Sequence, residues 1–112
     1  MRDMWTVELS TVGNPDWGQD PERPLHGADP NVERVIISLA EAQRYCREYI
    51  DRNNLGSGNF SGGAIRYNGG EPVAYVSYNG RIWLSANCGA PDQPAIDVTT
   101  PLHEVLRLAG KP

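Results

Sequence analysis

Three features are missing from this 112-residue sequence. No apolar run approaches the ~20 residues that a membrane-spanning helix needs. Only one of the ten basic residues is lysine, and no basic cluster is present to neutralise nucleic-acid phosphates. The two cysteines, Cys46 and Cys88, make no metal-binding spacing and are too few for the disulfide framework of a small secreted domain. These absences argue against a membrane protein, a direct nucleic-acid binder and a disulfide-stabilised secreted domain.

The remaining composition is that of an ordinary folded domain. Hydrophobic residues make up 39% of the chain and charged residues 21%. The first ten residues lack the apolar segment of a secretory signal peptide, so we expect a cytoplasmic protein. We expect a single domain over residues 1–112, and no pattern in it indicates a resident cofactor.

The net charge of −4 is distributed unevenly along the chain. Residues 1–33 hold seven acids and two arginines, whereas residues 34–85 hold six arginines and four acids. An acidic flank of this kind is suited to a basic surface on a partner.

The pattern of apolar residues predicts the order of the elements. Residues 4–12 alternate apolar and polar side chains as a half-buried strand does, and a second strand follows at 32–37. Between them, residues 13–31 hold four prolines and no periodicity, which predicts a long acidic loop. Residues 63–85 read as a meander of three short strands.

Two helices are predicted by their end signals. Ser38 and Glu41 form a capping box that begins a helix at Leu39, and this helix runs to about Asn53 with Gly56 at its left-handed C-terminal position. Its apolar stripe consists of Leu39, Ala42, Cys46, Tyr49 and Ile50. A shorter helix is expected over 101–109, with Thr100 as N-cap and Gly110 after its end.

The meander predicts which side chains share a face of the sheet. A two-residue type I′ turn at Asn79-Gly80 would pair Tyr78 with Arg81 and Val76 with Trp83. One face would then carry Ile65, Tyr67, Ala74, Val76, Tyr78 and Trp83, and the other Arg66, Val73, Tyr75, Ile82 and Leu84. The main helix is expected on the first face, and the second is apolar enough to need either the C-terminal helix or a partner. The predicted fold is α+β, an antiparallel sheet of about five strands in the order ββαβββα.

The acidic loop supplies the candidate binding residues, Asp16, Trp17, Asp20 and Glu22. Oxygen ligands at alternating spacing are compatible with Ca²⁺, but the order and the closing glutamate of an EF-hand are missing, so a proline-stiffened surface loop is the better interpretation. Trp17 either fills the edge of the core or anchors a partner, because tryptophan is enriched at binding hot spots.

Catalysis has little support in the sequence. His26 and His103 are far apart, no serine or cysteine occupies a nucleophile motif, and Cys46 falls on the buried stripe of the predicted helix. A pairing of Cys88 with His103 stays open. We expect a protein without catalytic activity.

The segment SLAEAQRYCREYI, followed by AIRYNGGEPVAYVSYNGRIW, resembles small proteins encoded by phages and plasmids, among them a type I-F anti-CRISPR family. The matching positions are Ser38, Leu39, Ala42, Ala74, Tyr75, Gly80, Arg81 and Trp83. The resemblance covers about half of the chain and implies an inhibitor that blocks a nucleic-acid-binding surface of a bacterial nucleoprotein defence complex.

The sequence therefore favours a non-catalytic protein-binding module, with Asp16, Trp17, Asp20 and Glu22 in contact with the partner. The first alternative is a homodimeric structural or accessory protein that pairs through Tyr75, Ile82 and Leu84. A small enzyme is the second alternative.

Overall fold

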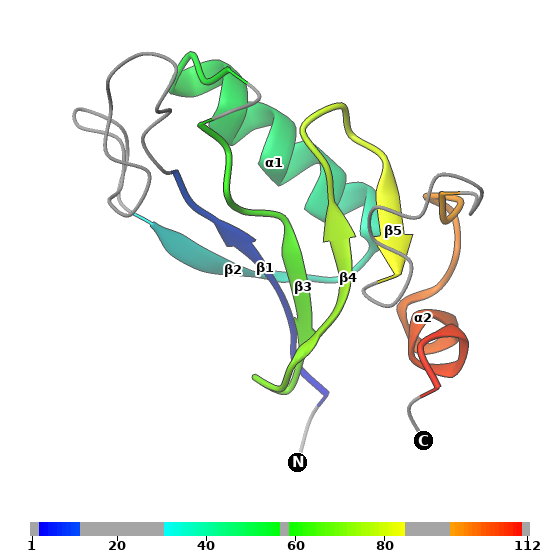
Figure 1. Cartoon of the computed structure of the whole chain (residues 1–112). Coiled ribbons are helices and arrows are strands. Elements are labelled where there is room, and N and C mark those ends of the chain that lie inside the picture. The colour runs from blue at the N-terminus through cyan, green and yellow to red at the C-terminus, as the bar shows by residue number, and fades with distance from the viewer. Residues whose placement is uncertain (1–2, 12–30, 57–58, 85–94, 111–112) are drawn as a thin grey trace.

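The computed structural model describes residues 3–11, 31–56, 59–84 and 95–110. Within these residues the elements follow the predicted order ββαβββα, and a five-stranded antiparallel sheet with two helices confirms the α+β fold (Figure 1). The elements are β1 (Trp5–Leu9), β2 (Val32–Ile36), α1 (Leu39–Arg52), β3 (Ala64–Tyr67), β4 (Pro72–Val76), β5 (Ile82–Leu84) and α2 (Leu102–Leu108).

The strands lie in the order β2-β1-β3-β4-β5. β1 is therefore an inner strand, paired on one side with β2 (Val7 opposite Arg34) and on the other with β3 (Val7 opposite Ile65). β2 and β5 are the two edges of the sheet (Figure 1). This order determines which strand is free to bind a partner.

The predicted capping box starts α1. The Ser38 hydroxyl oxygen accepts the Glu41 backbone N–H at 3.1 Å, and Glu41 Oε1 accepts the Ile37 backbone N–H at 3.1 Å. The Glu41 side chain thus bonds to the backbone of Ile37 rather than to that of the N-cap Ser38. This bond satisfies the first backbone N–H after β2. The start at Leu39 is confirmed.

The end of α1 differs from the prediction. The left-handed residue is Asn54, with φ 53°, and not Gly56. The Leu55 N–H donates to the Ile50 carbonyl at 3.0 Å, and the Asn54 N–H donates to the Asp51 carbonyl at 3.3 Å, which is the bonding of a Schellman motif. Asparagine tolerates this conformation, and the motif buries Leu55, which is 5% exposed.

One core lies between α1 and the sheet. The predicted stripe of α1, from Leu39 to Ile50, is buried as expected. It faces apolar side chains from all five strands: Trp5, Val7, Leu9, Ile36, Ile65, Ala74, Val76 and Ile82. Burial of this shared face is the main stabilising contribution. Cys46 packs here as a small apolar side chain.

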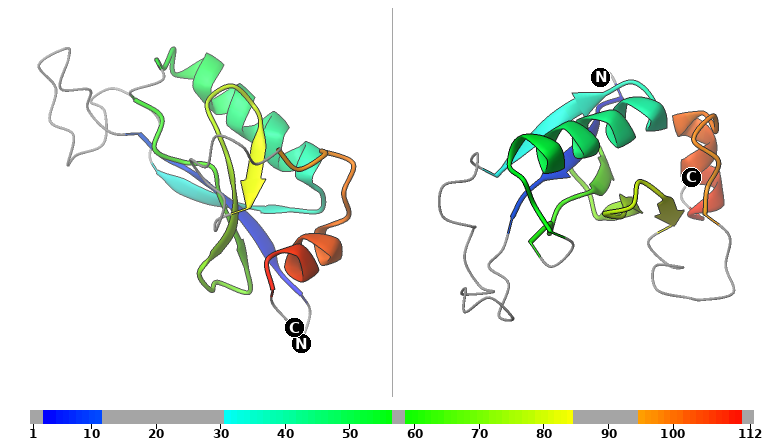
Figure 2. Two further views of the ribbon diagram at one scale, coloured as in Figure 1. Left: turned by 45° about the vertical axis from the view of Figure 1, so that its right-hand side comes forward. Right: turned by 90° about the horizontal axis from the view of Figure 1, so that it is seen from above.

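The C-terminal helix α2 joins the same core. Val105 is fully buried within it, and the turn before α2 forms a hollow of about 530 Å³ with Trp5 and the start of α1. α2 therefore lies beside the N-terminal end of α1 and does not cover the other face of the sheet (Figure 2). It begins at Leu102, and its N-cap is Pro101, which makes no side-chain bond, rather than the predicted Thr100.

The turn between β4 and β5 is also different from the prediction. It is a three-residue loop, Tyr78 to Gly80, closed by the Gly80 N–H to the Ser77 carbonyl and by the Ser77 N–H to the Arg81 carbonyl, both at 2.8 Å. Asn79 Oδ1 accepts the Arg81 N–H at 3.2 Å, and only Gly80 has a positive φ, 88°. The prediction of a two-residue turn at Asn79-Gly80 is wrong, because the Asn79 side chain stabilises the longer loop.

This longer loop moves β5 by one residue, and a one-residue slip exchanges the faces of a strand. Val76 lies opposite Ile82, and Tyr75 lies opposite Trp83. Ile82 is 1% exposed in the core, whereas Tyr75 is on the other side of the sheet. The predicted shared face of Tyr75, Ile82 and Leu84 is therefore wrong.

A type I′ turn does form in the preceding hairpin. Asn68 and Gly69 have φ values of 52° and 72°, and the Gly70 N–H donates to the Tyr67 carbonyl at 3.1 Å. The faces predicted for β3 and the end of β4 are accordingly confirmed: Ile65 and Val76 are buried in the core. Neither described helix is long and apolar enough to cross a membrane.

Candidate functional site

The outer edge of β2 is the most exposed part of the sheet. Four of its five residues, from Val32 to Val35, are exposed, and only Ile36 is buried. Val35 is 59% exposed, and Ile37, directly after the strand, is 81% exposed. Two large aliphatic side chains on one edge strand form an apolar surface that has no cover among the described residues.

Backbone hydrogen bonds show which way the groups of β2 point. On β1, the carbonyl of Glu8 accepts the Gly63 N–H at 2.6 Å, on the side of β3. Because backbone groups alternate along an antiparallel strand, the odd-numbered residues of β1 bond to β2. Their partners in β2 are Val32, Arg34 and Ile36. The N–H and C=O groups of Glu33 and Val35 therefore point outward.

This row of free outward groups ends at the C-terminal end of β2. Beyond Val35, the next outward N–H is that of Ile37, which is already bonded to Glu41. The free edge thus offers two N–H and two C=O groups, at Glu33 and Val35. Unpaired groups on an edge strand are a ready template for another strand.

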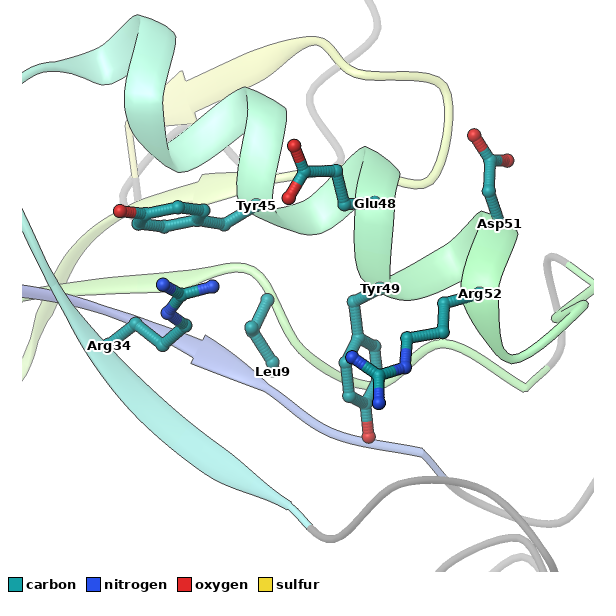
Figure 3. A pocket seen from close by; sticks show the side chains of 7 residues that line it. All are labelled: Leu9, Arg34, Tyr45, Glu48, Tyr49, Asp51 and Arg52. Carbon is teal, nitrogen blue, oxygen red and sulfur yellow. The ribbon is translucent and has the colours of Figure 1, made fainter.

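A groove runs between this edge and α1. It has a volume of about 360 Å³ (Figure 3). Its lining residues are Leu9, Arg34, Tyr45, Glu48, Tyr49, Asp51 and Arg52. They come from β1, β2 and α1, so a strand added to β2 would have the side chains of one face directed into the groove.

Arg34 is the central side chain of this groove. Its guanidinium carbon lies 3.8 Å from the centre of the Tyr45 ring, a cation–π contact between β2 and α1 (Figure 3). In the part of the chain that the structure describes, no carboxylate forms an ion pair with Arg34.

The acids of the groove are paired along α1 instead. The Arg44 guanidinium lies 3.8 Å from Glu48 Oε1, and that of Arg47 lies 2.9 Å from Asp51 Oδ1. Both pairs have i,i+4 spacing and are largely exposed to solvent. Among the described residues, no acid therefore compensates the positive charge of Arg34 in this groove.

On the opposite side of the sheet, Arg66 of β3 joins two acids from neighbouring strands. Its Nε atom lies 3.1 Å from Glu33 Oε1, and its Nη2 atom lies 3.7 Å from Glu8 Oε1. Glu8 and Glu33 are direct cross-strand neighbours and would repel each other without this arginine. The cluster fixes the β2 edge to the centre of the sheet.

The structure describes some of the candidate residues predicted from the sequence and not others. Asp16, Trp17, Asp20 and Glu22 lie outside the described residues. Of the predicted dimer face, Ile82 is in the core, Leu84 is half-buried beside the core, and Tyr75 is half-buried on the far side of the sheet next to Trp83.

Two features relevant to catalysis, metal ligands and the Cys46 thiol, can be checked in the described residues. Among residues 3–11, 31–56, 59–84 and 95–110, no three histidine, cysteine or acidic side chains come together as metal ligands. Burial raises the pKa of the Cys46 thiol to about 12, so this cysteine is protonated at neutral pH and unreactive as a nucleophile.

Arg34, Val35 and Tyr45 belong to no motif that would mark them as site residues in the sequence. The segment VERVII reads as an ordinary strand, and its edge position follows only from the strand order. The one available signal was the mixture of charged and aliphatic residues, which is typical of an edge strand rather than of an inner strand.

Comparison of the chain with models of protein families, with curated proteins and with solved structures found no match. The site has to be interpreted from its own geometry.

Proposed function

We propose that this protein is a non-catalytic protein-binding module that captures an extended segment of its partner as an added strand on β2. The observation that carries the proposal is the outward backbone of Glu33 and Val35 beside the groove of Arg34 and Tyr45. Added-strand recognition needs both parts, because backbone bonds supply affinity and a groove for alternate side chains supplies specificity.

The local geometry supports strand addition over flat surface contact. The free edge is short, its outward N–H and C=O groups lie at two alternate residues, and the groove opens directly beside it. Val35, on the other side of this strand, and Ile37, directly after it, offer apolar contact area. A bound segment would thus touch the protein through its backbone and both of its faces.

The test uses two substitutions at one position. Val35→Pro removes an outward N–H, and an edge strand tolerates proline at such a site. Val35→Thr keeps the N–H and the branched shape. Tagged wild-type protein and both variants are incubated with nuclease-treated bacterial lysate, and retained proteins are identified by mass spectrometry.

We expect a stoichiometric partner that the wild type and Val35→Thr retain and Val35→Pro loses. Circular dichroism and a thermal melt check that Val35→Pro is folded. A partner that binds all three forms equally would exclude strand addition at β2.

The role of such a module in a bacterial cytoplasm, as an inhibitor of a nucleoprotein defence complex, remains a prediction from the resemblance. An inhibitor of this kind needs only a rigid surface that blocks a site on its target. The variant Trp17→Ala tests whether the inhibitor contacts its target through the acidic loop as well as through β2. Loss of the partner without a change in melting temperature would make Trp17 part of the contact.

A further inference from the structure

The chemistry of the groove specifies the segment that β2 binds. We infer that the captured strand places an aspartate or glutamate opposite Arg34 on the groove side and aliphatic residues against Val35, on the other face of β2, and against Ile37, directly after the strand. This inference rests on the proposed function and adds the sequence preference of the partner.

The first step concerns geometry. Side chains of directly opposed residues in neighbouring strands point to the same face of the sheet, about 5 Å apart. The backbone of Arg34 bonds to β1, so Arg34 would be a non-hydrogen-bonded position toward an added strand, where opposed side chains are closest. The residue opposite Arg34 therefore projects into the groove beside the guanidinium.

The second step concerns desolvation. Arg34 is exposed in the free protein, and its guanidinium is covered on one side by the Tyr45 ring, at 3.8 Å. An added strand would cover the remaining side. Burying a charge without a partner is costly, and the nearby acids Glu48 and Asp51 are held by Arg44 and Arg47. A carboxylate from the captured strand compensates this charge, whereas a lysine or arginine would repel it.

The third step concerns the other face of β2. Val35 lies on the face of β2 away from the groove, and Ile37 follows the strand directly; their side chains are 59% and 81% exposed. Aliphatic or β-branched residues opposite them would bury this surface and suit a strand conformation. In the bound segment, the two neighbours of the acid lie on the face away from the groove. The neighbour opposite Val35 is aliphatic.

A second copy of this chain does not fit the pattern. When two β2 strands pair antiparallel about a two-fold axis, the groove-side faces of both strands lie on the same side of the joined sheet. The residue opposite Arg34 is then a groove-side residue of the other copy: Val32, Arg34, Ile36 or Ser38. None of these is acidic, because Glu33 is on the other face. Registers centred on Glu33 or Arg34 would place like charges directly opposite each other. The acid opposite Arg34 therefore does not come from β2 of a second copy.

The experiment is a selection from random eight-residue peptides displayed on phage, with the full-length protein as bait. Selected peptides are synthesised, and their affinities are measured by fluorescence anisotropy. The protein variants are Arg34→Gln, Arg34→Glu and Val35→Pro. Arg81→Gln serves as a charge-matched control in the loop before β5.

We expect enriched peptides to carry one acid and, directly next to it at the position opposite Val35, an aliphatic residue. Replacing that acid by its amide, or Arg34 by glutamine, should weaken binding by roughly tenfold or more, and the two changes together should be little worse than one. A lysine in the peptide should restore binding to Arg34→Glu. Arg81→Gln should bind as the wild type does.

The other outcomes separate the two proposals. Two results would overturn this inference and leave strand addition in place, provided that the peptides do not bind Val35→Pro. In the first, the selected peptides lack an acid. In the second, their affinity for Arg34→Gln is within twofold of that for the wild type. Peptides that bind Val35→Pro as well as the wild type, or a selection that yields no binder, overturn both.

Discussion

The two edges of the sheet are built differently. At β5 the Ile82 carbonyl accepts the Ile96 N–H at 2.6 Å, so chain that follows the strand covers the edge, and the Ile82 side chain is 1% exposed in the core. At β2, four residues are exposed, and no described residue bonds to the outward groups of Glu33 and Val35. An edge that its own chain covers belongs to the fold, whereas an edge left open with aliphatic side chains on it is available to a partner.

The largest expected effect contrasts one aliphatic residue from each edge. Ile82→Ala should lower the free energy of unfolding by about 2–5 kcal/mol, because it leaves a cavity in the core. Val35→Ala removes an exposed side chain and should change that free energy by less than about 0.5 kcal/mol. Urea titrations of both variants measure the difference. Equal losses would mean that β2 is as much part of the core as β5.

The second prediction concerns the buried side of the sheet. Burial raises the pKa of the Cys46 thiol from its ordinary value of 9.0 to about 12. Between these values the unfolded chain has lost the thiol proton while the folded protein keeps it, so stability falls as the pH rises from about 9 toward 12. Below pH 9 this group adds no pH dependence.

The measurement is the urea midpoint between pH 8 and pH 11, compared with a Cys46→Ala variant. The variant should be less stable at pH 8 and should lose less stability as the pH rises. Parallel pH dependences in the two proteins would place the thiol in contact with water.

The third prediction concerns the cluster that joins β2 to the sheet. Arg66→Gln should cost about 1 kcal/mol, because it leaves Glu8 and Glu33 opposed without their shared cation. Adding Glu33→Gln to this variant should recover most of the loss. Arg81→Gln, which removes an arginine without an ion pair in the described part of the chain, is the control. An Arg66→Gln protein as stable as this control would show that the cluster is fully screened by solvent.

The smallest expected effect is a gain. The Thr6 hydroxyl oxygen is buried in β1 and has no hydrogen-bond partner among the described residues. Thr6→Val keeps the shape and removes the unsatisfied group, so the free energy of unfolding should rise by about 0.5 kcal/mol. A thermal melt measures the change. A loss of stability would indicate that Thr6 is bonded in solution.

Local signals in the sequence predicted the elements well. The Ser38 cap, the stripe of α1 and the alternation of β1 depend on neighbours a few residues apart, and each is where it was expected. The β5 register was missed because the turn depends on tertiary contacts: the Gln43 side-chain amide of α1 donates to the Gly80 carbonyl at 2.7 Å and holds the longer loop.

The candidate site was missed for a different reason. That β2 is an edge follows from the pairing of β1 with β3, which joins Trp5 to Tyr67 across most of the chain. No pattern within five or six residues encodes that pairing. Likewise, the contact of Arg34 with Tyr45 depends on how α1 lies over β2.

The most direct test of the open edge is amide hydrogen exchange followed by NMR, for the free protein and for its complex with a captured partner. In the free protein, the N–H groups of Glu33 and Val35 should exchange rapidly, whereas those of Arg34 and Ile96 should be protected. In the complex, Glu33 and Val35 should become protected as well. Protection of these two groups in the free protein, or their continued rapid exchange in the complex, would contradict strand addition at β2.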